Sequence, residues 1–320
     1  MKITDNTTEL RHQVAEWKSA NSRVGFVPTM GALHDGHLAL VRRAVESTDR
    51  IVASIFVNPT QFGPDEDFDR YPRDLERDAE LLESAGANLL FCPQAETIYP
   101  DGHRTYVEVT GVSDTLEGEF RPRHFRGVAT VVTQLLNLVQ PDTAVFGEKD
   151  AQQLAVIRRL VRDLHLSVEI EALETVREED GLALSSRNAY LATEDRQAAT
   201  VLFRALSLAR SAIEEGERSA DALRTLLQET LATEARLDVE YAEVVDAETF
   251  DRIEYLAGSI VVPVAGRFGA TRLIDNIQID LQDADSGESL AGSREGARPS
   301  PTLRDPQLPL IRKGNQAKCD

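Results

Sequence analysis

The sequence predicts an α/β protein in which a parallel sheet, covered by helices on both faces, is followed by a smaller α+β domain. Two observations lead to this fold class. The first 175 residues alternate short apolar runs with stretches of helical periodicity, and the run at 51–57 is continuous and β-branched, as in a strand buried on both faces. After about residue 176, the strand-like stretches instead alternate apolar and polar residues, as in an antiparallel sheet. At 320 residues, the chain is long enough for two domains.

Local signals place each element of the first region in turn. Gly86 follows an amphipathic stretch and suits the left-handed position that ends a helix, and Pro141 ends another stretch because proline cannot continue it. We expect helices at 8–20, 38–47, 75–85, 124–139 and 150–163, and strands at 24–27, 51–57, 88–91, 143–146 and 167–173. Ligands of such a sheet bind at the carboxyl ends of its strands.

The second region predicts helices at 194–215 and 220–233 and strands at 239–245, 260–265 and 271–280. We therefore expect a sheet domain at 1–175, a smaller α+β domain at 176–282 and a tail at 283–320. The tail contains glycine, serine, proline and charged residues without hydrophobic periodicity, which predicts disorder. Its acidic and basic residues are equal in number, so the net charge of −19 falls on residues 1–282.

Charge and composition restrict the classes of function. A formal net charge of −19 argues against nucleic-acid partners and anionic membranes, which would repel the protein at long range. No apolar run approaches the roughly 20 residues of a membrane span, and the N-terminus lacks the apolar core of a signal peptide, so we expect a cytoplasmic protein. Cys92 and Cys319 are too isolated for a disulfide framework or a zinc site. The acidic excess has two open explanations, a high-salt cytoplasm or solubility alone.

The stretch PTMGALHDGH, residues 28–37, follows the first predicted strand and precedes a predicted helix. His34 and His37 are three residues apart and can face the same way, while the start of a helix offers unpaired N–H groups to a phosphate. Gly36 removes a Cβ where a ligand must come close. The stretch therefore predicts an anion site. The alternatives are two unrelated surface histidines, or a metal site for which no third ligand is obvious nearby.

A second group, GEKD at residues 147–150, stands where a later parallel strand ends and a helix begins. Both turns lie on the same edge of the predicted sheet, so Lys149 can approach a ligand held by the histidines and neutralise a phosphate during transfer. Gln153, one helical turn onward, projects to the same side. The alternative is an ordinary helix start with Asp150 near the N-cap.

Polar side chains in two further stretches are candidates for ligand contacts. The stretch SSRN at 185–188 offers two hydroxyls and an arginine to phosphate oxygens, and such a loop can close over a nucleotide; a polar turn with hydroxyl caps is the alternative. In NPTQF at 58–62, Gln61 either binds a hydroxy acid or has no role. A basic group either steers anions or forms a solvated surface patch: Arg121, Arg123, His124 and Arg126. Neither GxxxxGK[ST] nor GxGxxG is present, so any bound ATP is not held by a P-loop.

Four motifs together resemble those of the pantothenate synthetase (pantoate–β-alanine ligase) family in order and spacing: PTMGALHDGH, SIFVNPTQF, VFGEKDAQQL and REEDGLALSSRN. The resemblance covers residues 3–282, whereas the H-x-G-H element alone would indicate only the wider nucleotidyltransferase group shared with class I aminoacyl-tRNA synthetases. It implies a Rossmann-type, nucleotidyltransferase-like N-terminal domain, a smaller C-terminal lid, a homodimer, and a requirement for ATP and Mg²⁺. It further implies that (R)-pantoate and ATP give enzyme-bound pantoyl adenylate and pyrophosphate. β-Alanine then attacks, AMP leaves, and the product is pantothenate, the vitamin B5 precursor of coenzyme A.

The resemblance also implies roles for individual residues. His37 matches the residue usually named as proton donor, and five others stabilise the charge on phosphate with it: His34, Lys149, Ser185, Ser186 and Arg187. The implied ATP-binding residues are Met30, Gly31, Ala32, Leu33, His34, Asp35, Gly36, His37, Gly147, Glu148, Lys149, Asp150, Val176, Leu184, Ser185, Ser186 and Arg187. Gln61 and Gln153 hold pantoate, and the place beside Gln61 later admits β-alanine. The metal ligands are left unidentified.

Two residues depart from the family pattern, and two other functions are considered. Leu184 stands where methionine is common before the two serines, with little effect expected because the volumes are similar. Ala151 replaces a common aromatic residue, which we expect to loosen packing. One alternative function is a nucleotidyltransferase that joins ATP to a phosphorylated cofactor precursor, which would not need both glutamines. The other is a catalytically silent nucleotide-binding regulator, against which the intact histidines, lysine and SSRN loop argue.

Overall fold

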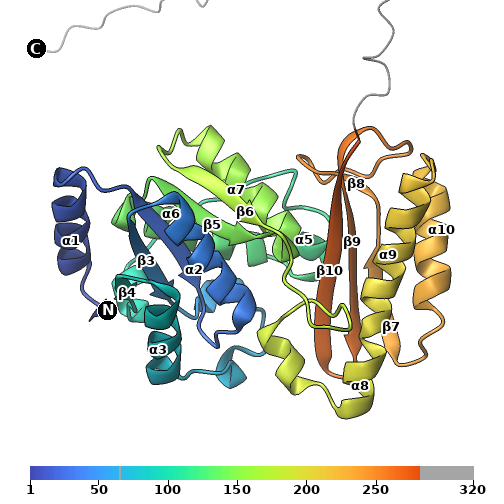
Figure 1. Ribbon diagram of the computed structural model, residues 1–320, viewed down its shortest axis with the longest axis horizontal. Coiled ribbons are helices and arrows are strands. Elements are labelled where there is room, and N and C mark those ends of the chain that lie inside the picture. The colour runs from blue at the N-terminus through green and yellow to red at the C-terminus, as the bar shows by residue number, and fades with distance from the viewer. Residues whose placement is uncertain (65, 282–320) are drawn as a thin grey trace, which may run out of the picture. The chain divides into compact units, whose positions relative to one another are not determined.

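Runs of buried apolar residues form the first sheet in the computed structural model, which describes residues 1–64 and 66–281 (Figure 1). Its six strands are β1 (Lys2–Thr4), β2 (Val24–Thr29), β3 (Arg50–Ile55), β4 (Leu89–Phe91), β5 (Thr143–Gly147) and β6 (Glu169–Leu173). All pair in parallel, in the order β1-β4-β3-β2-β5-β6, which confirms the predicted parallel sheet. The edge strand β1 is missing from the sequence prediction because three residues carry too little periodicity. The predicted tail at 283–320 lies outside the described residues.

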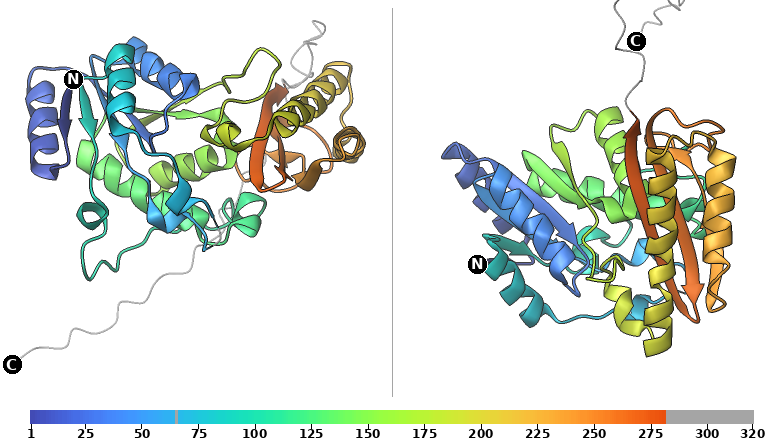
Figure 2. Two further views of the ribbon diagram at one scale, coloured as in Figure 1. Left: turned by 90° about the horizontal axis from the view of Figure 1, so that it is seen from below. Right: turned by 45° about the vertical axis from the view of Figure 1, so that its right-hand side comes forward.

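Helices cover both faces of this sheet (Figures 1 and 2). On one face, a single hydrophobic cluster joins the strands to α1 (Thr7–Ser19), α4 (Ala95–Ile98), α6 (His124–Val139) and α7 (Ala151–Asp163). On the other face, a second cluster contains α2 (Asp35–Ser47) and α3 (Leu75–Ala85), and the short α5 (Glu117–Phe120) precedes α6. Phe26 and Val27, neighbours in β2, belong to opposite clusters. Burial on both faces explains why the strands read as continuous apolar runs.

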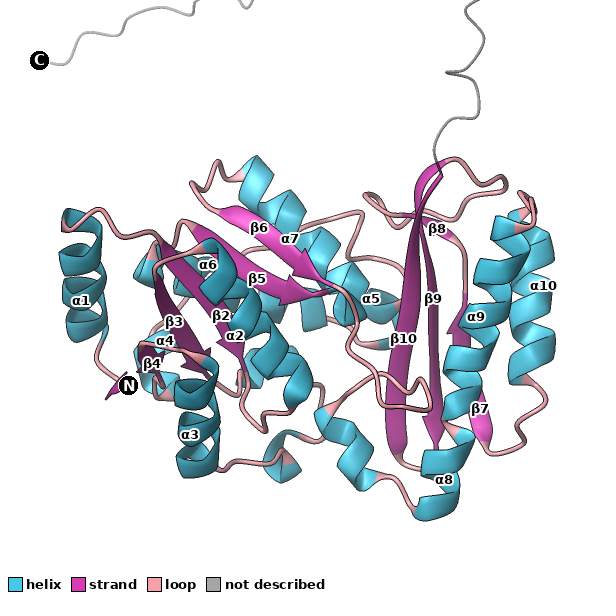
Figure 3. Ribbon diagram, viewed as in Figure 1, coloured by secondary structure: helices cyan, strands magenta, loops and turns pink. Residues whose placement is uncertain are grey.

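A second sheet is antiparallel and follows in the chain (Figure 3). Its strands are β7 (Leu237–Ala242), β8 (Val245–Asp246), β9 (Gly258–Phe268) and β10 (Thr271–Leu281), and the helices before them are α8 (Thr193–Ala198), α9 (Thr200–Glu214) and α10 (Ala220–Leu231). The predicted helix 194–215 is wrong in being continuous, since it breaks at Ala199 without a glycine or proline to signal it. The predicted strand 239–245 is likewise two strands. Pro263 of β9 faces this break and has no N–H to donate to the ladder.

Alternate residues of β9 belong to two different cores. Ile260 and Val262 pack in a cluster with α9 and α10, which lie along one side of the sheet in Figure 3. Val261 and Ala265 pack in another cluster, together with residues of α6 and α7 such as Ala151. The two sheets therefore share a hydrophobic core, and the domain boundary at residue 175 stays a prediction.

Candidate active site

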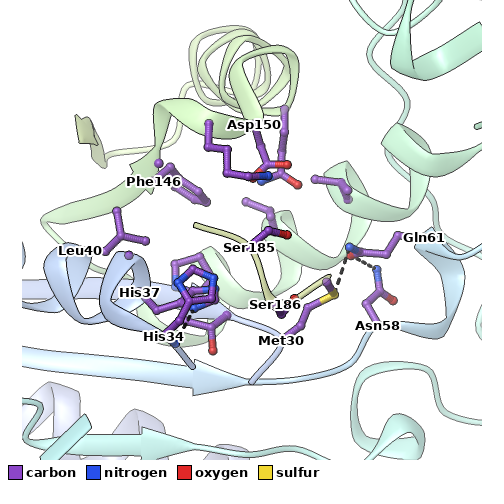
Figure 4. A pocket seen from close by; sticks show the side chains of 18 of the residues that line it. Met30, His34, His37, Leu40, Asn58, Gln61, Phe146, Asp150, Ser185 and Ser186 are labelled. Carbon is purple, nitrogen blue, oxygen red and sulfur yellow. Dashed lines mark hydrogen bonds between the residues drawn. The ribbon is translucent and has the colours of Figure 1, made fainter. Parts of the chain in front are cut away.

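The strand order opens a cleft between β2 and β5. The chain continues from β2 to β3 and β4 on one side and from β5 to β6 on the other, so the order reverses between these two strands, where ligands of open α/β sheets bind. β2 and β5 pair only at Gly25–Thr143 and Phe26–Ala144, although both strands continue further. Pro28, which has no N–H, stands in β2 where this pairing has ended. A cavity of about 240 Å³ lies at this edge (Figure 4).

Most of the predicted site residues line this one cavity. Those on its wall are Met30, His34, Gly36, His37, Gln61, Gly147, Lys149, Asp150, Gln153, Val176, Leu184, Ser185, Ser186 and Arg187. Five predicted ATP-binding residues are not on the wall: Gly31, Ala32, Leu33, Asp35 and Glu148. The reason is clearest at Ala32 and Leu33, whose backbone N–H groups donate to the buried Asp78 carboxylate at 2.8 and 2.9 Å. These two amides are therefore already occupied by protein.

The histidine pair stands at the start of α2, as the sequence predicts. His34 is the N-cap residue, His37 is the third residue of the helix, and their ring centroids lie 4.0 Å apart. A Cβ on Gly36 would lie 3.0 Å from atoms of the His34 ring, so this glycine makes room for the ring itself. The expectation that Gly36 serves only the approach of a ligand is thus extended by a contact within the protein.

Both histidines are neutral at pH 7 in the structure. Burial lowers the pKa of His37 to about 3, helped by the nearby His34 and Lys149. Burial also lowers the pKa of His34 to about 4, again helped by Lys149. His37 Nδ1 accepts from the backbone N–H of His34 at 3.4 Å, which assigns the ring proton of His37 to Nε2. Nδ1 of His34 is buried, and no atom of the described residues bonds to it. The pair can therefore offer hydrogen bonds to an anion without itself carrying charge.

Gln61 is oriented by Asn58 (Figure 4). Asn58 is 1% exposed, and its Nδ2 donates to Gln61 Oε1 at 2.9 Å. The Gln61 amide nitrogen therefore faces Met30, with Nε2 at 3.2 Å from the sulfur, and points its N–H groups at the cavity. The sequence motif contains Asn58 but predicts no role for it, because its partner is identified only by the fold.

Arg121 and His124 also line the cavity, so the solvated surface patch considered for them is wrong. His124 is 8% exposed, and Arg121 is held by Glu66 at 2.6 Å, an ion pair that sequence spacing does not show. Arg126 lies over the Tyr106 ring, 4.2 Å from its centroid.

The SSRN loop is both a cavity wall and a capped turn. Ser185 Oγ accepts from the Arg187 backbone N–H at 3.2 Å, so the predicted alternative of a hydroxyl cap is realised at this serine. The Arg187 guanidinium binds Asp67 at 3.0 and 2.9 Å, and this carboxylate balances its charge. Ser186 Oγ lies 3.4 Å from the hydroxyl of Tyr71.

Two searches cover only the residues that the structure describes. Within 1–64 and 66–281, three or more His, Cys, Asp or Glu side chains nowhere gather as a metal site would require. In the same ranges, every helix is too short or too polar to cross a membrane.

Comparison with known proteins identifies the family. A family model described as pantoate-beta-alanine ligase matches residues 2–278. The pantothenate synthetases of Heliobacterium modesticaldum and Acetivibrio thermocellus are 50% and 48% identical to this chain over 281 residues, covering 88% of this chain and 100% of each relative. The four motifs of the sequence analysis thus pointed to the right family.

Solved structures agree with this match and with the predicted fold class. The pantothenate synthetase of Thermus thermophilus is similar with a TM-score of 0.82 and 49% identity, covering 87% of this chain and 99% of that one. The pantoate–β-alanine ligase of Francisella tularensis, solved with beta-gamma ATP and β-alanine, gives a TM-score of 0.70 and 34% identity over 87% of this chain and 97% of that one. Sequence, fold and site therefore lead to one conclusion: the chain belongs to the pantoate–β-alanine ligase family.

Proposed function

We propose that the cleft between β2 and β5 is the active site, and that it joins (R)-pantoate to β-alanine through an enzyme-bound pantoyl adenylate. The observation that carries this proposal is the convergence of His34, His37 and Lys149 with Gln61 and Gln153 on one cavity. The chemistry favours two steps because a carboxylate is a poor acylating agent, whereas a mixed anhydride with AMP has a good leaving group.

In the first step, a carboxylate oxygen of pantoate attacks the α-phosphorus of ATP, and the bond to the departing pyrophosphate breaks. Negative charge grows on the phosphate oxygens, where preorganised donors have their largest effect. His37 donates from Nε2–H, and Lys149 supplies the nearby positive charge. The anionic phosphates would in turn raise the pKa of both histidines, because an adjacent negative charge favours the protonated ring.

Pantoate fits the opposite part of the cavity. The Nε2–H groups of Gln61 suit an oxygen of its hydroxyls or carboxylate, and Gln153 adds a second amide. Four apolar residues of α6 line the same cavity and suit an aliphatic carbon skeleton: Val128, Val131, Val132 and Leu135. This combination supports a branched hydroxy acid as the acid substrate.

In the second step, the amine of β-alanine attacks the acyl carbon, the acyl–oxygen bond breaks and AMP leaves. We place β-alanine beside Gln61, where the cavity continues toward His124. The adenylate hydrolyses readily, so water must be kept out while the amine enters. The segment from Val176 to Leu184, closed by a hydrogen bond of 2.9 Å between Leu184 N–H and the Val176 carbonyl, and the SSRN loop after it are the parts of the wall suited to this task.

We infer Mg²⁺ as a companion of ATP. Mg²⁺ is usually held by one or two carboxylates together with substrate phosphates, and Asp150 supplies a carboxylate on the wall next to Lys149. The ion would neutralise phosphate charge. The ATP-binding roles of Gly31, Ala32, Leu33, Asp35 and Glu148 stay predictions that rest on the resemblance.

We also infer a homodimer, a cytoplasmic location and a division at residue 175 into a sheet domain and a lid. The first two follow from the resemblance and from composition, and the third from the change of pattern along the sequence. Light scattering on the purified chain tests the dimer, since a monomer mass at micromolar concentration would contradict it. Fractionation of cells that express the chain tests the location.

The decisive test follows pyrophosphate and AMP separately. With ATP and pantoate alone, we expect a pyrophosphate burst equal to the enzyme concentration; with β-alanine added, we expect sustained release of AMP. Pyrophosphate release that ignores pantoate in well-folded protein would remove the proposal and favour the nucleotidyltransferase alternative, which acts on another acceptor.

A further inference from the structure

The backbone of Gln61 is docked against one face of helix α6. Its carbonyl oxygen lies 2.9 Å from Nδ1 of His124. Three residues further along the helix, a Cβ on Gly127 would lie 2.5 Å from the carbonyl oxygen of Thr60 and 2.7 Å from the amide nitrogen of Gln61. Only glycine permits this approach, so the loop and the helix are in direct backbone contact. The place of the Gln61 side chain in the cavity therefore depends on this helix face.

Arg121 decides which nitrogen of His124 carries the proton. Its Nη1 lies 3.2 Å from Nε2 of the ring, and a guanidinium can only donate, so Nε2 must accept. The proton of the neutral ring is then on Nδ1, which donates to the Gln61 carbonyl. Burial and the charge of Arg121 lower the pKa of His124 to about 4, so the ring is neutral at pH 7. Both nitrogens have protein partners, and neither remains for a substrate.

Arg121 is itself fixed by two carboxylates. Glu66 accepts from its Nε at 2.7 Å and from its Nη2 at 2.6 Å, and Glu117 lies 3.9 Å away. Glu117 in turn binds Arg272 of β10 at 2.8 Å and accepts from the hydroxyl of Tyr241 of β7 at 2.7 Å. A continuous series of charged and polar contacts therefore runs from the second sheet to the Gln61 carbonyl. Its position is set by groups that are far apart in the sequence.

We propose that His124 is a positioning residue for pantoate, acting through the hydrogen bond from Nδ1–H to the Gln61 carbonyl in the tautomer that Arg121 imposes. The proposal rests on the proposed function, because it takes Gln61 as a pantoate-binding residue. His124 makes and breaks no bond in the reaction. Its effect is to hold the Gln61 amide where pantoate meets it, so its loss should weaken pantoate binding selectively.

The experiment compares two substitutions at His124. His124→Leu removes the donor, and we expect the KM for pantoate to rise about tenfold, the scale of one lost hydrogen bond, while the KM for ATP stays within about twofold. His124→Asn places an amide N–H near the position of Nδ1 and should restore the pantoate KM to within about threefold of the native value. His12→Leu is the matched control, because His12 is exposed on α1 and should change neither constant.

Two kinetic outcomes would overturn the proposal. One is a folded His124→Leu protein with a native KM for pantoate; the other is an equal rise in both KM values that asparagine does not rescue, which indicates a structural role alone. If His124→Leu does not fold, Arg121→Gln and Arg121→Leu replace it: glutamine keeps a donor to Nε2 and should be the milder change, and equal effects contradict the proposal.

A spectroscopic measurement does not depend on activity. In ¹⁵N-labelled native protein at pH 7, the His124 ring should show a protonated Nδ1 and an unprotonated Nε2, and the opposite tautomer overturns the proposal. Failure of the proposed function is separate, since it is seen in the native enzyme as the absence of pantoate-dependent pyrophosphate release.

Discussion

Asp78 holds one wall of the cleft from inside the first sheet, whereas Asn276 holds the opposite wall from the second sheet. The Asp78 carboxylate accepts the N–H groups of Ala32 and Leu33, just before the histidines. The Asn276 side chain, on β10, donates to the carbonyls of Glu148 and Lys149 at 2.9 Å each. The histidine wall is thus built by the parallel sheet and its helices, while the lysine wall requires that both sheets be in place.

A second contact strengthens this difference. Asp275, 2% exposed and next to Asn276, binds the Arg177 guanidinium at 2.6 and 2.9 Å and so fixes the segment that carries Val176. The second sheet therefore orients two parts of the cleft without itself supplying a charged group to the phosphates. Its contribution to the reaction is preorganisation, which is where much of the catalytic effect of an enzyme arises.

The largest effect is expected on the histidine wall. His37→Ala should slow adenylation by about 100-fold or more, because it removes a positioned donor to the developing phosphate charge. Pantoate-dependent pyrophosphate release measures the rate, and circular dichroism should show an intact fold. His12→Ala is the control with an exposed histidine. Near-native release from folded His37→Ala would remove this histidine from the mechanism.

Asp78→Ala tests whether the histidine wall is held within the first sheet. Removal of the carboxylate leaves the N–H groups of Ala32 and Leu33 without their partner, so the free energy of unfolding should fall by about 2 kcal/mol. Urea titration measures this loss. Asp163, an exposed aspartate that pairs only on the surface, is the matched control, and Asp163→Ala should cost much less because solvent screens such pairs. Equal losses at the two positions would contradict the assignment.

Asn276→Leu tests whether the lysine wall is held by the second sheet. Leucine conserves the shape but cannot donate to the two carbonyls, so we expect kcat for adenylation to fall about tenfold through misplacement of Lys149. The KM for pantoate should change little. Asn137→Leu, on the exposed side of α6, is the matched control. If the two variants have equal kcat values, the second sheet does not set the lysine wall.

The smallest effect is a pH dependence of stability that belongs to the histidine wall. The pKa of His37 is about 3 in the folded chain against an ordinary value of 6.5, so between these values the unfolded chain binds a proton that the folded chain does not. The free energy of unfolding is therefore unaffected above pH 6.5 and falls as the pH drops toward 3. Between about pH 6.5 and about pH 5.5, His37→Ala should lose about 1 kcal/mol less than the native chain in urea titrations. Parallel losses would contradict the neutral assignment.

The parts of the molecule that sequence could predict are those that depend on local signals. The strands of the first sheet are predictable because continuous apolar runs show burial on both faces, and the site because parallel strands end at one edge. The roles of Asp78 and Asn276 could not be predicted, because their partners lie 45 and 127 residues or more away. Arg187 illustrates the same limit: its residue type suggests a phosphate ligand, and only the fold reveals Asp67 beside it.

The hydrophobic cluster shared by β9, α6 and α7 has a consequence for protein engineering. Val261 and Ala265 pack with Ala151 and Val156, so a chain cut at residue 175 would expose apolar surface on both fragments. A chimaera that exchanges the second sheet between relatives must therefore carry the matching faces of α6 and α7 with it. The unit of exchange in this protein is a packed interface rather than a stretch of sequence.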